Sequence, residues 1–494
     1  MYSMHWYETL MIVVYLISLT FLCLYSLGQL DLTIKYMKNR RRHSNTNTLK
    51  PLQHFPAVTV QLPIYNERFV VERLIDACCA MNYPKDRLEI QILDDSNDDT
   101  SDIIKKKIAH YAPRGIKLMH IQRPDRVGFK AGALAHGMSL AMGDFIAIFD
   151  ADFVPHNDFL LDTIPHFKDK EIGMVQTRWG HINRNYSIFT KMQAFGLNAH
   201  FSIEQSARND LHSFINFNGT AGIWRKSCIQ EAGGWSADTL TEDLDLSYRA
   251  QLKGWKFKYL EEVETPAELP ILMPAIKSQQ YRWNKGAAET SVKNLRRVYQ
   301  QALPLRTKIH ATFHLLNSSV FLILLIASVL SLPLLVIKSM HPNLLILFHI
   351  ANIFLIGFFS IGIYFYVASK RSRYTTIKES FFTYFVTFMM ISMGMSLHNG
   401  LAVLEGFIGK KTPFVRTPKF GSTDTSGLSA KNAYLNFKFS PLSIVEGILG
   451  LYFLAGIGLG IYLHDFGLVV FHAMLAVGFL TISYQSVKNP VHAT

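Results

Sequence analysis

The sequence of 494 residues is poor in cysteine and in charge. Its four cysteines contain no Cys-x-x-Cys pair and no zinc-ligand spacing, which argues against a disulfide framework and a zinc module. Charged residues make up 18% of the chain, whereas they supply about a quarter of a typical soluble domain. Internal repeats and long low-complexity segments are also absent. These absences argue against a disulfide-rich, fibrous, disordered or entirely soluble protein.

The charge that is present is mainly positive. Lys and Arg number 50 against 37 Asp and Glu, a net charge of +13. Such an excess fits a nucleic acid, the cytosolic face of a membrane or an anionic substrate. Much of it flanks apolar segments, so we expect a lipid bilayer as partner and no nucleic acid. Six basic residues follow the first apolar run: Lys35, Lys38, Arg40, Arg41, Arg42 and Lys50.

Long apolar runs predict membrane helices. Leu10–Leu30 has no charge and is long enough for a bilayer core of ~30 Å. It exceeds the ~7–15 apolar residues of a signal peptide and lacks a basic start, so residues 1–34 are predicted to be a retained anchor. The basic residues after it place its C-terminal end in the cytosol. Further runs are Thr312–Ile337, Leu344–Ser369, Ser380–Leu404, Gly447–His464 and Phe466–Tyr484.

The run Ser380–Leu404 differs from the others. Basic loops flank it on both sides, against the positive-inside tendency of a crossing segment, and it contains His398 and Asn399. We therefore expect an amphipathic segment at about 380–405 along the cytosolic interface. The predicted organisation is an anchor (1–34), a cytosolic domain (50–300) and a membrane domain (301–494) with about four further crossings. We therefore expect a multi-pass protein of the plasma (inner) membrane.

The region before residue 300 has the pattern of an α/β domain. Apolar, β-branched segments alternate with helical stretches such as Phe69–Ala80 and Ile103–His110, which predicts a mostly parallel sheet with helices on both faces. Ligands bind beyond the carboxyl ends of the strands in such sheets. The predicted strands are Val58–Leu62, Leu88–Leu93, Ile116–Ile121 and Phe145–Phe149.

Acidic clusters fall at these strand ends. An Asp-x-Asp pair, Asp150 and Asp152, offers two hard oxygen ligands that suit Mg²⁺ or Mn²⁺ held against a diphosphate. Alone, such a pair is more often a cap or a surface turn. Several clusters at successive strand ends favour the cation, because their mutual repulsion is costly without one. The other clusters are Tyr65–Glu67 and Asp94–Asp95.

Lys130 and Asp243 are both predicted at helix starts. A lysine there opposes the helix dipole unless an anion binds; the alternative for Lys130 is a surface lysine. Asp243, in Thr-Glu-Asp before the helical stretch Leu244–Ala250, is a candidate general base. The alternative is a capping role for Asp243 and Glu242.

The stretch Gln279-Gln-Tyr-Arg-Trp283 comes directly before the membrane runs. Arg282 can bind a diphosphate through its planar fork, and Trp283 can stack on a sugar ring. A tryptophan with a basic neighbour at the membrane interface is the alternative.

In their order, these motifs resemble processive family 2 glycosyltransferases of the cellulose synthase type, strongly over about 50–300 and more loosely to about 440. The resemblance is to the glucomannan 4-beta-mannosyltransferase and beta-1,4-glucan synthase group and its bacterial homologues. The stretches that carry it are FNGTAGIWR (217–225), EAGGW (231–235), QQYRW (279–283) and FVRTPKF (414–420).

The resemblance implies a GT-A domain joined to an α-helical transmembrane bundle, with an inverting mechanism that depends on Mg²⁺ or Mn²⁺. A gating loop is implied at about 410–422, where Arg416 stands in place of the family's valine. The implied donor residues are Tyr65, Glu67, Asp94 or Asp95, Lys130, Asp150, Gln279 and Arg282. Asp150 and Asp152 would hold the metal, Asp243 would be the catalytic base, Glu242 and Trp283 would bind the acceptor, and Phe414, Thr417 and Lys419 would act in the gating loop.

The implied reaction transfers a hexose from UDP-glucose or GDP-mannose to the non-reducing end of a growing beta-linked polysaccharide, which the membrane helices translocate. A non-processive, lipid-linked sugar transferase is the alternative enzyme. A transporter or an inactive scaffold is the non-enzymatic alternative.

Overall fold

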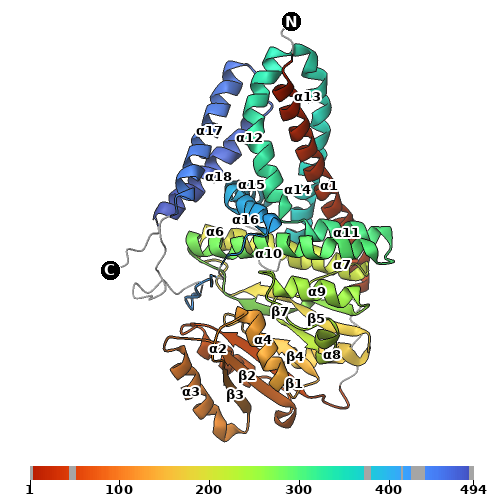
Figure 1. Cartoon of the computed structure of the whole chain (residues 1–494), viewed down its shortest axis with the longest axis vertical. Helices are drawn as coiled ribbons and strands as arrows, with labels where there is room; N and C mark the ends of the chain where they lie inside the picture. Colours follow the sequence, from red (N-terminus) through yellow and green to blue (C-terminus); the bar gives the residue numbers. More distant parts are fainter. Residues whose placement is uncertain (1–3, 44–51, 372–379, 413–414, 424–439, 489–494) are drawn as a thin grey trace.

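The computed structural model describes residues 4–43, 52–371, 380–412, 415–423 and 440–488. An α/β domain forms one end of the molecule, long apolar helices form the other, and helices that lie across the long axis separate them (Figure 1).

The α/β domain is built on one seven-stranded sheet with the order β3-β2-β1-β4-β6-β5-β7. Strands β1 to β4 run parallel, and so do β5 and β7, whereas β6 is antiparallel to both of its neighbours. The predicted mostly parallel sheet is confirmed, and its four predicted strands end within two residues of the observed ones. The strands are β1 (Val58–Ile64), β2 (Leu88–Asp94), β3 (Lys117–Gln122), β4 (Phe145–Ile148), β5 (Ile172–His181), β6 (Gly222–Arg225) and β7 (Lys256–Ala267).

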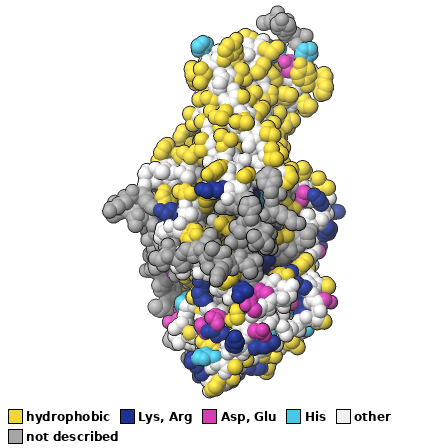
Figure 2. All heavy atoms as spheres, turned by 90° about the vertical axis from the view of Figure 1, so that its left-hand side faces the viewer, with side chains coloured by type: hydrophobic (Ala, Val, Ile, Leu, Met, Phe, Trp, Pro, Cys, Tyr) yellow, Lys and Arg dark blue, Asp and Glu magenta, His cyan; other side chains and the backbone are white. Residues whose placement is uncertain are grey.

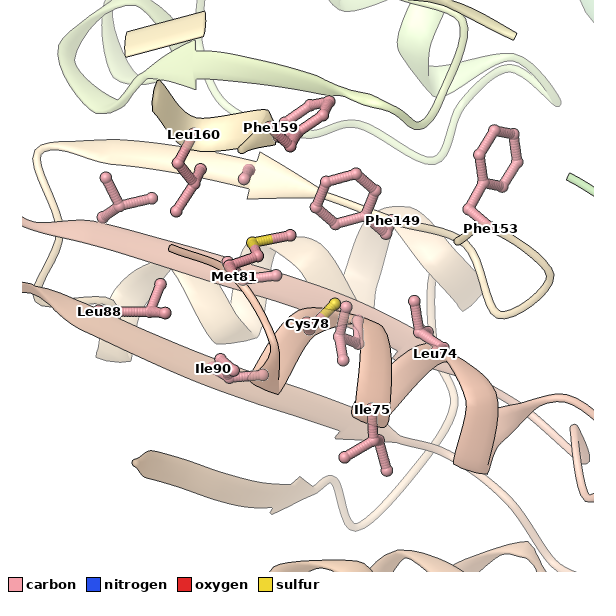
Figure 3. Packing of buried hydrophobic residues seen from close by; sticks show 14 of the residues in the cluster. Leu74, Ile75, Cys78, Met81, Leu88, Ile90, Phe149, Phe153, Phe159 and Leu160 are labelled. Carbon is pink, nitrogen blue, oxygen red and sulfur yellow. The ribbon is translucent and has the colours of Figure 1, made fainter. Parts of the chain in front are cut away.

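Helices cover both faces of the sheet, as the buried clusters on its two sides show. In α2, Val71, Leu74, Ile75 and Cys78 are buried at the spacing of one helical face. Figure 3 shows three of them packed in the cluster that includes Phe149. One face carries α2 (Val71–Cys79), α3 (Thr100–Tyr111) and α5 (Phe159–Thr163), and the other carries α4 (Phe129–Leu140), α8 (Lys226–Glu231) and α9 (Glu242–Leu252).

Transverse helices connect the sheet to the apolar helices (Figure 1). The longest, α10 (Met273–Gln300), contains the predicted Gln279–Trp283 motif. An apolar cluster joins this layer to the long helices through Leu32, Phe195 and Phe365. The other transverse helices are α6 (Ile188–Ala199), the π-helix η4 (His200–Gln205), α7 (Ser206–Asp210) and α11 (Leu305–Leu315).

Five helical segments in the described part of the chain are long and apolar enough to cross a bilayer. A sixth results if α15 (Phe381–Gly394) and α16 (Ser396–Ile408), bent by 51°, count as one. Figure 2 shows hydrophobic side chains over the end of the molecule that these helices form and charged ones over the α/β domain. The segments are Trp6–Asn39 in α1 (Trp6–His43), α12 (Ser319–Met340), Pro342–Arg371 with α13 (Leu345–Ala351) and α14 (Leu355–Arg371), α17 (Leu442–Tyr462) and α18 (Val469–Lys488).

The helix boundaries refine the expected membrane runs. The run predicted to begin at Thr312 is divided, because α11 ends at Leu315 and α12 begins at Ser319. The predicted interfacial segment at about 380–405 corresponds to the bent pair α15 and α16. Its place at the interface, and the number and direction of the crossings, remain predictions.

Candidate active site

A cavity of about 190 Å³ lies beyond the carboxyl ends of the parallel strands. Most of the side chains singled out in the sequence line it, although they are spread over more than 350 residues. Asp94 does not line it, and Phe414 lies outside the described residues. The predicted residues that line the cavity are Tyr65, Glu67, Asp95, Lys130, Asp150, Asp152, Glu242, Asp243, Gln279, Arg282, Trp283, Thr417 and Lys419.

The Asp-x-Asp pair follows β4. Asp150 accepts a hydrogen bond of 2.6 Å from Lys130 Nζ. Asp152 Oδ2 lies 2.6 Å from Lys419 Nζ, while its buried Oδ1 has no hydrogen-bond partner among the described residues. Because a buried acceptor is normally satisfied, Asp152 Oδ1 is an atom that is ready to take a ligand.

The residues present fit a divalent cation only in part. In the described part of the chain, no group of three or more His, Cys, Asp or Glu side chains could hold a metal ion. Mg²⁺ in phosphate-binding sites is commonly held by one or two carboxylates together with substrate phosphates and water. Asp152 and Asp150 satisfy that smaller requirement, so a bound diphosphate would have to complete the site.

Asp243 lies in the first turn of α9, as the sequence predicted, next to Glu242. Its Oδ1 accepts a hydrogen bond of 2.8 Å from the Leu244 amide. Burial raises the pKa of Asp243 to about 7, and the Glu242 carboxylate adds to the effect while Lys130 opposes it. A carboxylate with a pKa near neutrality can accept a proton effectively at physiological pH.

Lys130 connects the two acidic groups. It lies in the first turn of α4, donates to Asp150 and to the Gly219 carbonyl at 2.9 Å, and lies 4.0 Å from Glu242. Burial lowers the pKa of Lys130, but the nearby carboxylates outweigh it and hold the pKa above its usual value. The anion that the sequence argument required at this helix start is the Asp150 carboxylate in this structure.

The α10 motif faces the cavity from the side of the transverse helices. Arg282 Nη2 donates a hydrogen bond of 2.6 Å to the Thr417 hydroxyl. Trp283 and Gln279 line both this cavity and a second, largely apolar one of about 250 Å³. The second cavity continues toward the long helices; its lining includes Phe189, Phe321, Phe388 and Met395.

Residues 415–422, which we call the strap, cover the predicted donor residues. Arg416 forms an ion pair of 2.9 Å with Glu67 and donates to the Asn66 carbonyl. The far end of the strap is anchored because Glu268 accepts hydrogen bonds from the Phe420 amide at 3.0 Å and the Ser422 hydroxyl at 2.8 Å. Burial raises the pKa of Glu67 to about 7 despite the opposing charges of Arg416 and Lys419. The strap thus brings two cations to buried carboxylates.

The two aspartates after β2 have different surroundings. Asp94 is buried and accepts hydrogen bonds from the Ser96 amide and the Ser101 hydroxyl, and it lies 2.8 Å from His120 Nε2. Although burial acts in the opposite direction, these contacts hold the pKa of Asp94 below its usual value. Asp95 lines the cavity and pairs with Arg123 at 2.5 Å. Of the two donor candidates, only Asp95 reaches the cavity.

Sequence reasoning missed several residues that line the cavity. The Arg126 guanidinium lies 3.2 Å from the centre of the Tyr65 ring. Glu268 directly follows β7, so the rule that singled out the other strand ends could also have found it. Asn218, which lines the cavity, was inside a quoted motif but had no assigned role.

Comparison with known proteins agrees with the fold and the motifs. The chain matches the family described as "Glycosyl transferase family group 2" over residues 145–397 and "Glycosyl transferase family 2" over 59–230. It is 46% identical over 239 residues to the rice (Oryza sativa subsp. japonica) protein named "Probable glucomannan 4-beta-mannosyltransferase 4". It is 43% identical over 239 residues to glucomannan 4-beta-mannosyltransferase 9 of Arabidopsis thaliana. These alignments cover 47% of this chain and 44% and 45% of the relatives, so the chain matches less than half of their length.

The fold also resembles a solved structure, that of the mannosyltransferase PcManGT from Pyrobaculum calidifontis in complex with GDP-Man and Mn²⁺. The TM-score is 0.52 at 19% identity, and the match covers 74% of this chain and 100% of the other. At this identity the likeness shows the fold alone, and it confirms the expected GT-A architecture. Since the family match over 145–397 spans just over half of the 494 residues, the chain belongs to glycosyl transferase family group 2.

Proposed function

We propose that this protein transfers a hexose from a nucleoside diphosphate sugar, with UDP-glucose and GDP-mannose as the candidate donors, to the non-reducing end of a beta-linked polysaccharide. The observation that carries the proposal is the convergence of Asp243, Asp150, Asp152, Arg282 and Trp283 on one cavity. These residues supply a base, a site for a diphosphate and a surface for an acceptor sugar. The mannosyltransferase names of the relatives support a hexose donor.

The strand order supports an orientation for the donor. Asp95, Tyr65 and Asp150 follow β2, β1 and β4, which are successive strands of the sheet. Asp243 lies against Gly219, just before β6, and the Trp283 ring centre lies 6.4 Å from that of Trp179 in β5. Strands β6 and β5 follow β4 on the side away from β1. With the diphosphate at the pair, the nucleoside would lie toward Tyr65 and the sugar toward Asp243.

The proposed chemistry is one in-line displacement at the anomeric carbon. Asp243 takes the proton of the acceptor hydroxyl, the hydroxyl oxygen bonds to the anomeric carbon, and the bond from that carbon to the diphosphate oxygen breaks. A single displacement inverts the anomeric centre, so an α-linked donor gives a β-linkage. A pKa of about 7 leaves a large share of Asp243 deprotonated at neutral pH, and the carboxylate is then basic enough to take the proton.

Positive side chains would stabilise the departing diphosphate. Arg282 and Lys130 lie on the walls of the cavity, and Lys419 reaches Asp152 from the strap. A divalent ion held by Asp152 and Asp150 would add positive charge at the leaving group. Contact of the strap with a bound donor would also exclude water, as closing loops do in other transferases.

The second cavity is the proposed start of an exit path. It shares Trp283 and Gln279 with the first and continues among α6, α10, α12, α15 and α16. A polymer extended on the Trp283 side would therefore enter the helical bundle. We propose that these helices translocate the product across the plasma (inner) membrane from a cytosolic active site.

The test is a panel of radiolabelled donors given to the purified full chain in lipid nanodiscs with Mg²⁺ or Mn²⁺. We expect UDP-glucose or GDP-mannose to yield a polymer with beta linkages, determined by linkage analysis. Short products on a lipid carrier would instead support a non-processive transferase. The absence of both sugar transfer and nucleotide binding would contradict the proposal.

A further inference from the structure

Lys285, two residues beyond Trp283 on α10, has a charged side chain without solvent exposure. Its Nζ donates two hydrogen bonds of 2.6 Å, one to the Lys410 carbonyl and one to the Thr412 hydroxyl. Both acceptors come just after the end of α16, on the chain that leads to the strap. A buried ammonium is costly unless it is hydrogen-bonded, so these contacts tie that segment firmly to α10.

The two helices also meet closely at this point. A Cβ built on Gly406 of α16 would lie 2.6 Å from the Lys285 carbonyl oxygen and 2.7 Å from the Ala288 Cβ, so no larger residue fits without a shift. Tyr281 of α10 donates to Glu405 of α16. The end of α16 therefore has a fixed position on α10, and Lys285 extends that attachment beyond the helix end.

The contacts of the strap follow the same helix. Lys285 bonds Thr412, and Arg282, about one helical turn earlier, bonds Thr417. Helix α10 therefore bonds Thr412, shortly before the strap, at one turn and Thr417 of the strap at the next, and it carries Trp283 between these two contacts. Both acceptors lie beyond the α16 C-cap at Gly409, so the two bonds of Lys285 act on the segment that leads to the strap and do not cap α16.

We propose that Lys285 is a positioning residue for the donor. It holds residues 410–412 so that Thr417 and Lys419 reach Arg282 and Asp152, and so the strap is pre-set over the diphosphate site. This inference rests on the proposed function, because it assumes that the donor binds beneath the strap. Lys285 itself is not among the residues that line the cavity, so its effect on the donor is indirect.

The test compares Lys285→Met and Thr412→Val in the full chain in nanodiscs. Hydrogen–deuterium exchange should become faster over residues 415–422 in both variants, with exchange in α10 and α16 unchanged. The donor KM should rise about tenfold for Lys285→Met, because two bonds to a charged group are lost, and less for Thr412→Val. The kcat should stay within about threefold, since saturating donor restores the closed strap.

Lys308→Met is the matched control. Lys308 also donates to a backbone carbonyl, that of Tyr299 near the end of α10, and none of its interactions in the described part of the chain is with residues 415–422. We expect wild-type exchange and KM for it. If Lys285→Met does not fold, Thr412→Val carries the test.

Wild-type exchange over 415–422 together with a wild-type KM in the folded variants would overturn the inference. A lower kcat at unchanged KM would also overturn it, because that result indicates general damage. If the wild-type chain uses no nucleotide sugar, the proposed function fails, and the exchange measurement still decides whether Lys285 positions the strap.

Discussion

Gly219 lies directly against the carboxylate of Asp243. A Cβ built on Gly219 would be 2.9 Å from Asp243 Oδ2 and 3.3 Å from Lys130 Nζ. The backbone of Gly219 has a φ of +79°, and its carbonyl accepts a hydrogen bond from Lys130. A single glycine therefore allows the candidate base and the candidate donor lysine to sit side by side.

Gly219→Ala should therefore displace Asp243. We expect transfer to fall by at least about tenfold, because a small misplacement of a reacting group is costly, while nucleoside diphosphate binding changes less. The control is Gly115→Ala, since Gly115 also has a positive φ, of +70°, but open space around it. Equal loss of activity in both variants, measured by initial rates, would mean that backbone strain and not the Asp243 contact is responsible.

The pH dependence of the reaction should depend on Glu242. The neighbouring Glu242 charge helps to raise the pKa of Asp243, so removing it in Glu242→Gln should lower that pKa. The acidic limb of the kcat/KM profile should then move to lower pH, on the order of one pH unit. Glu171→Gln, a change at an exposed site that pairs with Lys256, should leave the limb unmoved. A limb that stays in place in Glu242→Gln would contradict the assignment of Asp243 as the titrating base.

Lys419 should compete with a divalent cation in the donor-free protein. Its ammonium pairs with Asp152, a proposed metal ligand, at 2.6 Å. Lys419→Met removes this positive charge and leaves the Asp152 carboxylate without its ion pair. We expect tighter Mn²⁺ binding without donor, measured by electron paramagnetic resonance titration, and weaker donor binding. Lys411→Met is the control, because Lys411 Nζ donates to the Asp238 carbonyl oxygen at 3.4 Å instead. This variant should change neither the Mn²⁺ affinity nor the donor affinity. Unchanged Mn²⁺ affinity in Lys419→Met would contradict the competition.

Trp283 should act on the acceptor and not on the donor. It lines both cavities, and its ring centre lies 6.4 Å from that of Trp179. Trp283→Ala should reduce polymer formation by more than about tenfold, because stacking on a sugar ring is lost, with donor affinity close to wild type. Trp283→Phe keeps a flat apolar ring and should recover part of the activity. Product length and donor binding measured together would separate these effects, and a loss confined to donor binding would contradict the role.

The fold was largely predictable because its signals are local. The β-branched segments before Pro63 and Asp94 mark strands, and alternation with helices indicates a parallel sheet. The strand-end rule then groups Tyr65, Asp95 and Asp150 at one edge. The division of the run Thr312–Ile337 was missed, although the polar residues Asn317, Ser318 and Ser319 lie where α11 and α12 meet.

The side-chain contacts between distant parts of the chain are the part of the site that the sequence could not predict. Asp94 and Asp95 are adjacent in sequence, yet β-strand alternation turns one toward Ser101 and His120 and the other toward the cavity. The pairing of Arg416 with Glu67 joins residues about 350 positions apart. Such pairings depend on tertiary packing, for which a single sequence carries no periodic signal.

The most direct test of the central claim is the turnover of Asp243→Asn. We expect this variant to bind the donor as tightly as the wild type, because Asp243 faces the acceptor side of the proposed site. Sugar transfer should fall by about 10²–10⁴-fold, the usual contribution of a general base. Wild-type transfer by a folded Asp243→Asn variant would contradict the proposed active site.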